Sequence, residues 1–206
     1  TIVFVGFAII QSVFSLTEYG TIHNIVYTIL QVPFQSIGLS MIGNAVTEVA
    51  ATLFMFLGVH ANTIIGIVEP VRLAAAVENL AALQAGLPLP NIVVTGFSGL
   101  ALIGAGGSLL SATLAFLFFT KSKRYQSISK MALIPGIFGV GEPILFGLPI
   151  MLNPVAFIPF IGVVLFNQIY AYLVIALGFV GRFTGVAISW TVPPFLNMFL
   201  SNSTPV

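Results

Sequence analysis

The feature that most constrains this chain is a series of long apolar runs, each interrupted by glycine or proline. Only 5% of its 206 residues are charged and 58% are hydrophobic. A soluble domain carries about 25% charged residues, so most of this surface cannot face water. The composition therefore predicts an all-α, polytopic membrane protein.

Helices that cross a bilayer need about 20 mainly apolar residues. The sequence predicts the end of one such helix over residues 1–16, and further spans over 37–58, 91–120, 154–179 and 186–200. Small residues within 91–120 favour close helix packing in lipid.

Two intervening segments, 59–90 and 134–154, combine apolar residues with repeated breaks. Broken backbone at membrane depth is tolerated only inside protein or beside a wet cavity. We therefore expect a re-entrant hairpin in each, the first followed by an amphipathic helix.

Four of the six basic residues fall in KSKRYQSISK, residues 121–130. By the positive-inside rule this stretch is predicted to be a cytoplasmic loop. The segment 134–154 would then enter the membrane from the cytoplasmic side.

Both broken segments contain a Glu-Pro step, at Glu69 and at Glu142. Proline favours the first position of a helix, so each glutamate is expected to cap a helix N-terminus, where an anion is stabilised. For Glu69, a cap paired with the nearby Arg72 is favoured over a substrate contact. For Glu142 a buried functional role is favoured, because residues 131–181 contain no base.

Glu48 lies near the middle of an expected span, and its partner stays open between another helix and chain outside these residues. His60 is equally compatible with packing and with a ligand contact. The single tryptophan, Trp190, fits a membrane-interface position better than a platform for a sugar ring.

Several classes of function are excluded or disfavoured. A net charge of +1 gives no basic footprint for nucleic acid. Two histidines and no cysteine make a metal site improbable, and no nucleotide-binding loop is present, so no cofactor is expected. The chain begins without methionine inside an apolar run, which suggests part of a longer protein.

Three motifs carry a resemblance to a known family: GVGEPILFGLPIMLNP (139–154), SWTVPPFLNMFL (189–200) and LGVHAN (57–62). Together they resemble the membrane component IIC of bacterial sugar phosphotransferase systems, in the lactose/cellobiose/diacetylchitobiose family. The resemblance implies that residues 1–206 are the C-terminal, substrate-binding half of a IIC transporter domain. It also implies a homodimer formed through an N-terminal half that is absent here.

The resemblance further implies a permease of the bacterial cytoplasmic membrane that binds a β-linked disaccharide such as cellobiose, diacetylchitobiose or lactose. Its 6-hydroxyl would be phosphorylated by a phosphocysteine on a IIB partner, itself served by IIA. Glu142 would contact the reacting hydroxyl as the catalytic residue. His60, Asn62 and Trp190 would complete the sugar site.

Two positions depart from the family pattern: Gly141 stands where asparagine is usual, and Ala61 where glycine is usual. Two other functions are also compatible with the residues. One is a proton-coupled secondary sugar transporter that uses Glu142 together with Glu48. The other is a non-catalytic channel or assembly subunit.

Overall fold

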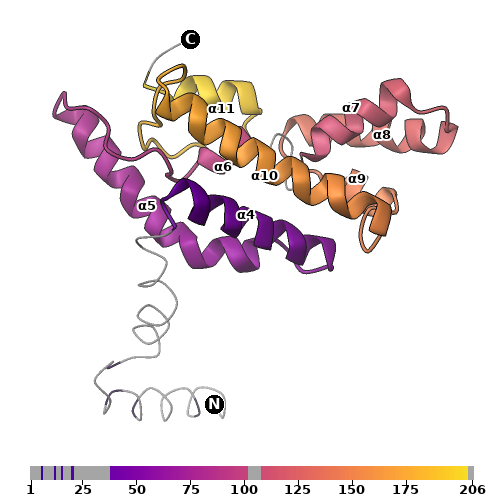
Figure 1. Cartoon of the computed structure of the whole chain (residues 1–206), viewed down its shortest axis with the longest axis horizontal. Helices are drawn as coiled ribbons and strands as arrows, with labels where there is room; N and C mark the ends of the chain where they lie inside the picture. The colour runs from indigo at the N-terminus through magenta and orange to yellow at the C-terminus, as the bar shows by residue number, and fades with distance from the viewer. Residues whose placement is uncertain are drawn as a thin grey trace.

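The computed structural model describes residues 38–101 and 108–203, together with positions 6, 12, 15 and 20. Within these ranges the chain is helical and has no β-strand beyond a single bridge between Phe183 and Asn202. The main helices, drawn in Figure 1, are α4 (Met41–Phe56), α5 (Asn62–Gln84), α6 (Phe97–Ala101), α7 (Leu109–Phe119), α8 (Lys123–Ile137), α9 (Glu142–Gly147), α10 (Pro154–Ala176) and α11 (Pro194–Ser201). The span expected over 1–16 lies almost wholly outside the described residues.

Helices α4, α5 and α10 form the body of the molecule (Figure 1). The helix α4 packs against both α5 and α10. Its start is fixed by Ser40, whose hydroxyl accepts a hydrogen bond from the Gly43 N–H at 3.0 Å. In the same way Asn153 caps α10 by accepting from Val155, with Pro154 at the first helical position.

Helices α7 and α8 lie side by side at one end of the molecule, and both contact the short α9 (Figure 1). One buried apolar cluster joins α9 to the ends of α4 and α10 and to α7 and α8: Met55, Phe56, Leu109, Ala132, Ile144, Leu145, Leu148, Ile150 and Phe160. A second cluster joins α5, α6 and the last turns of α10. The chain is therefore held by two cores rather than one.

Two predicted spans are confirmed as helices with somewhat different ends. The run predicted over 37–58 is α4, shortened because Ser40 caps it. The run predicted over 154–179 is α10, which ends at Ala176. Among the described helices α10 alone has the length and apolar composition to cross a membrane, whereas α4 and α7 are apolar but shorter.

The other two predicted spans are wrong. Residues 91–96 are not helical, because Asn91 is bound to α5 through Asn79 and Glu78. Helices α6 and α7 follow, and residues 102–107 of this predicted span lie outside the described residues. Over residues 186–200 the backbone is non-helical up to Pro193, and only the eight-residue α11 follows. Consecutive prolines lack N–H donors, so a helix can begin there but cannot pass through.

The break predicted at the Glu69–Pro70 step is also wrong. Helix α5 runs continuously over 23 residues with Pro70 in its interior, so Glu69 does not cap a helix. The missing proline N–H leaves the carbonyl of Gly66 without its helical donor. Side chains on both sides of Pro70 are held by other elements, as described below, and these contacts keep the helix continuous.

The basic stretch predicted as a loop is mostly helical, since residues 123–130 form the first half of α8. The break predicted within 134–154 is confirmed. After α8 ends at Ile137, a turn leads to α9, and a second non-helical segment leads to α10.

Residues 181–189 form an extended strap that crosses α5 at close range. The Asn79 amide donates to the carbonyl of Phe183 at 2.7 Å, and the Arg182 guanidinium donates to the carbonyls of Leu89 and Pro90. Gly185 has a φ of +84°, and a Cβ there would lie 1.9 Å from the carbonyl oxygen of Ala76. The crossing therefore requires glycine.

We predict that Gly185→Ala lowers the free energy of unfolding by about 3 kcal/mol, since it adds backbone strain to a steric clash. Denaturation by SDS in mixed micelles would measure this. The matched control is Gly162→Ala in α10, where an added Cβ meets nothing within 4 Å. Equal stability of the two variants would show that the strap does not need this close approach.

Candidate substrate site

The structure brings together two residues that are 82 positions apart, His60 and Glu142. The His60 Nε2 atom lies 3.8 Å from Glu142 Oε1. Their side chains are 60% and 38% exposed, respectively. A polar pair is thus presented at the surface of the described chain, where a ligand can reach it.

The positions of both residues follow from helix ends. His60 lies in the turn 57–61 between α4 and α5, and Glu142 is the first residue of α9. The turn is joined to the segment after α9 because Leu152 donates its N–H to the carbonyl of Phe56 at 3.3 Å. Residues of both segments also contribute to the first apolar cluster.

A hydrogen bond determines which tautomer a neutral His60 adopts. The backbone N–H of Asn62 donates to His60 Nδ1 at 3.2 Å. Since Nδ1 is the acceptor, a neutral imidazole carries its proton on Nε2, the atom that lies toward Glu142. His60 therefore offers a donor, and Glu142 an acceptor, on the same side of the site.

Trp190 approaches the same region through Gly139. A Cβ added at Gly139, whose φ is +83°, would lie 2.9 Å from the Trp190 carbonyl oxygen and 3.5 Å from its indole ring. Gly139 precedes Glu142 by three residues, so the tryptophan packs on the turn that delivers the carboxylate. Trp190 as a whole stays 70% exposed.

The prediction of a buried Glu142 is not met within the described chain, because its side chain is only partly covered. Glu142 is the first residue of α9 and Gly141 is its N-cap, so the acid lies in the first turn but does not cap the helix as predicted. Asn62 begins α5 and is exposed, and its backbone N–H donates to His60. The fully buried acid is Glu48, on α4.

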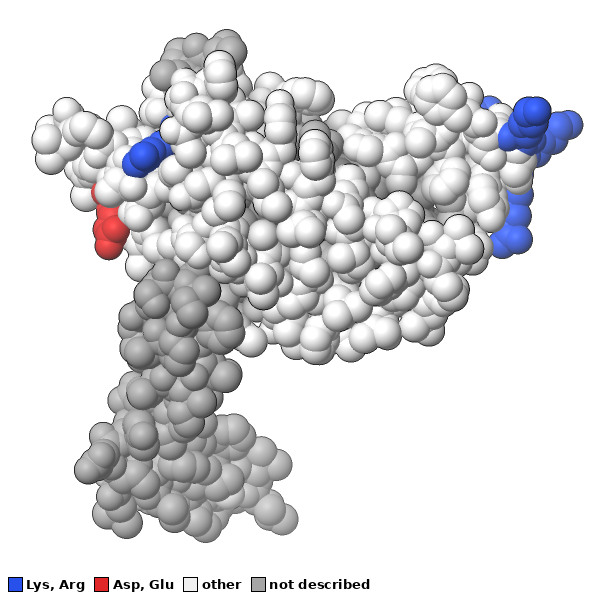
Figure 2. All heavy atoms as spheres, in the orientation of Figure 1, with Lys and Arg blue, Asp and Glu red and all other residues white. Residues whose placement is uncertain are grey.

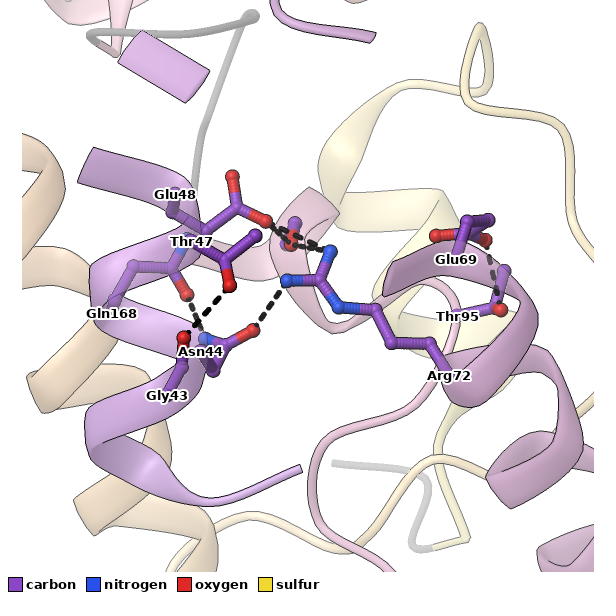
Figure 3. Close-up of polar contacts among 9 residues, drawn as sticks. Gly43, Asn44, Thr47, Glu48, Glu69, Arg72, Thr95 and Gln168 are labelled. Atoms are coloured by element: carbon purple, nitrogen blue, oxygen red, sulfur yellow. Dashed lines mark hydrogen bonds and ion pairs between the residues drawn. The ribbon is translucent and has the colours of Figure 1, made fainter. Parts of the chain in front are cut away.

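Glu48 takes part in a buried polar network that Figure 3 shows between α4 and α5. Arg72 Nη1 lies 2.9 Å from Glu48 Oε1, and Arg72 Nη2 donates to Asn44 Oδ1 at 2.7 Å. The Asn44 amide in turn donates to Gln168 of α10 at 2.7 Å. Ser98 of α6 donates to Glu48 Oε1 at 2.6 Å.

The predicted pairing of Arg72 with Glu69 is therefore wrong. Glu69 instead accepts a hydrogen bond from Thr95 at 2.9 Å (Figure 3). One sequence signal could have found the true pair. Arg72 is the sole lysine or arginine among residues 1–120, and a carboxylate within an apolar helix needs a cation.

No group of three histidine or acidic side chains that could hold a metal ion is found among residues 38–101 and 108–203. The arrangement can bind a neutral polar ligand. Such a ligand would accept a hydrogen bond from His60, donate one to Glu142 and pack against the indole ring of Trp190.

A family model described as "Phosphotransferase system, EIIC" matches residues 1–162. The chain belongs to the EIIC family. It is 32% identical over 201 residues to the oligo-beta-mannoside-specific EIIC component of Bacillus subtilis (strain 168), covering 96% of this chain and 46% of that relative. It is 32% identical over 193 residues to the cellobiose-specific EIIC component of Geobacillus stearothermophilus, covering 92% and 43%.

Among solved structures, this EIIC chain resembles the transporter ChbC, the IIC component of the N,N'-diacetylchitobiose-specific phosphotransferase system. The TM-score is 0.79 at 34% identity, over 94% of this chain and 45% of that one. The chain spans less than half the length of these relatives. The likeness supports the all-helical architecture described above.

We predict that Gly139→Ala displaces Trp190 and shifts the fluorescence emission of its indole to longer wavelength, because the added Cβ clashes with the Trp190 carbonyl oxygen and moves the backbone that carries the ring. The Trp190 signal is isolated by subtracting the spectrum of Trp190→Phe. Gly66→Ala, where an added Cβ meets nothing within 4 Å, is the control. An unshifted spectrum in Gly139→Ala would contradict the packing of Trp190 on this turn.

Proposed function

We propose that this EIIC chain supplies the sugar-binding half of a permease whose substrate is phosphorylated on its 6-hydroxyl by a phosphocysteine of a IIB partner. The observation that carries the proposal is the approach of His60 Nε2 to Glu142 Oε1, which are partly exposed and next to the turn that packs against Trp190. IIA would rephosphorylate IIB. No nucleic acid or cofactor takes part.

The chemistry needs little from the chain beyond position. The sugar oxygen forms a bond to phosphorus while the bond from phosphorus to the cysteine sulfur breaks, and the hydroxyl proton is released. Glu142 accepts a hydrogen bond from this hydroxyl and takes up its proton, while the Nε2 proton of His60 orients a sugar oxygen. Phosphoryl transfer is catalysed mainly by such positioning and by electrostatics.

The substrate class is proposed to be a β-linked disaccharide. Relatives named for oligo-beta-mannoside, cellobiose and lactose, and the diacetylchitobiose-specific structure, support this class. The apolar face of a sugar ring matches an exposed indole, as Trp190 provides. Asn62, exposed at the start of α5, would contact a second part of the sugar.

The distribution of charge supports an orientation in the bacterial cytoplasmic membrane. Figure 2 shows basic side chains gathered where α7 meets α8, and a second charged group at the opposite end, with neither colour between them on this face. The basic end belongs to Lys121, Lys123, Arg124 and Lys130. We assign it to the cytoplasm. Figure 1 shows α9 and the α4–α5 turn on that same side of the molecule.

In this arrangement the chain crosses the membrane several times, and the segment 134–154, which breaks before α9 and carries Glu142, is re-entrant. The turn between α4 and α5, which carries His60, would meet it at the sugar. A homodimer would form through residues outside this chain.

We predict that Glu142→Gln lowers the rate of sugar phosphorylation at least about 100-fold, since the amide cannot take up the proton. The dissociation constant of the sugar changes less than about tenfold, because the amide still accepts a hydrogen bond. Phosphorylated IIB and a panel of β-linked disaccharides provide the assay. Equal losses in rate and affinity would restrict Glu142 to binding.

Transport assays in sealed vesicles separate this function from proton-coupled transport. With phosphorylated IIB present, we expect sugar to accumulate only as its 6-phosphate, with or without a proton gradient. Accumulation of unmodified sugar driven by the gradient, without sugar phosphate, would overturn the proposal. Unchanged affinity in both Glu142→Gln and His60→Ala would remove these residues from the site.

A further inference from the structure

We propose that the buried pair Glu48–Arg72 is a positioning device for the site: it fixes the rotation and register of the α4–α5 hairpin so that His60 faces Glu142. The inference rests on the proposed function for its consequence in catalysis. Its geometric part stands on the network itself.

The pair has a symmetric place in the hairpin. Glu48 precedes His60 by twelve residues and Arg72 follows it by twelve. Counted along each helix, the pair lies between roughly two and three turns below the tip. If α4 and α5 rotate or slide against each other at this level, the position of His60 at the tip therefore changes as well.

The network ties the hairpin to the rest of the chain in two directions. Through Asn44 it reaches Gln168 of α10, and through Ser98 it reaches α6. Ser98 contacts both members of the pair, since it donates to Glu48 and accepts from Arg72 Nη1 at 3.3 Å. Four helices thus share one set of directional bonds.

In a bilayer the hydrophobic effect does not hold this register. Lipid tails are as apolar as leucine, so an apolar helix face that slides out of contact loses little. Exposed apolar residues such as Ile42 and Val46 on α4, or Leu73 and Val77 on α5, would tolerate a rotated hairpin. Rotation of either helix would instead leave Glu48 or Arg72 charged and unpaired, and an unpaired buried charge strongly destabilises the protein.

The tip is held mainly by apolar contacts without fixed direction, so its exact position depends on the network below. Met55 and Phe56, at the end of α4, belong to the first apolar cluster, and the Leu152 N–H donates to the carbonyl of Phe56. His60 itself is mostly exposed.

Distances between spin labels test the proposal in the whole protein in bilayers. Labels on Val59→Cys, at the tip, and Phe146→Cys, on α9, report the separation of the two parts of the site; both parent residues are exposed. Residues 1–206 contain no cysteine, so labelling within them is specific. We expect one narrow distance distribution in the parent protein, and at least twofold broader distributions in Glu48→Gln and Arg72→Met.

Two further variants separate positioning from stability. Asn79 is fully buried on the same helix, α5, and its side-chain amide binds the loop at Asn91 and the strap at Phe183. We therefore expect Asn79→Ala to lower the stability of the protein without altering the distance between the two labels. The double variant Glu48→Gln/Arg72→Met leaves no unpaired charge and tests whether charge or directional bonding matters. We expect the distance distribution of this double variant to stay broad, because its side chains no longer fix the register of α4 against α5.

If the single variants fail to fold, Ser98→Ala is the milder test, since it removes one shared bond and leaves both charges paired. We expect a smaller broadening there and a fall of about tenfold in the phosphorylation rate with little change in sugar affinity. Distances equal to the parent in all folded variants would overturn the positioning role. A parent that never forms sugar phosphate would overturn the proposed function and leave the distance result standing.

Discussion

The contact between the carboxylate of Glu48 and the guanidinium of Arg72 is the interaction on which the rest of this structure depends. Both groups are enclosed by the chain and lie 2.9 Å apart. Removing one partner of such a pair leaves an uncompensated charge and costs about 3–5 kcal/mol. The pair therefore ties α4 to α5 and, through Asn44, Gln168 and Ser98, connects that hairpin to α10 and α6.

The site has the opposite character. His60 and Glu142 are open, belong to segments far apart in the sequence, and meet at 3.8 Å with little between them and solvent. Both residues lie at helix ends: His60 is in the turn between α4 and α5, and Glu142 is the first residue of α9. Side chains at such ends can face each other although their helices are far apart in the sequence. A chain with few charges thus uses one acid–base pair as framework and leaves another for a ligand.

The proline positions show where a local sequence rule predicts the start of a helix and where tertiary contacts override that rule. At Pro143 the expected helix start was met to within one residue, since α9 begins at Glu142. At Pro70 the same rule failed, since Arg72 and Glu69 on either side are bound to other elements and keep α5 continuous. The prediction of a span over 91–120 failed because Asn79 binds the loop at Asn91. The prediction over 186–200 failed because a helix cannot pass through the consecutive prolines before α11.

The sequence alone determined the all-helical class, the EIIC motifs, the break before Glu142 and the candidate residues His60, Asn62, Glu142 and Trp190. These follow from local rules: apolar content, proline and glycine positions, and scarcity of charge. Tertiary structure decided which charges pair, that Glu48 rather than Glu142 is enclosed, and that His60 reaches Glu142. Such pairings depend on how distant helices are placed, and Arg72 has a nearer acid in sequence than the one it contacts in space.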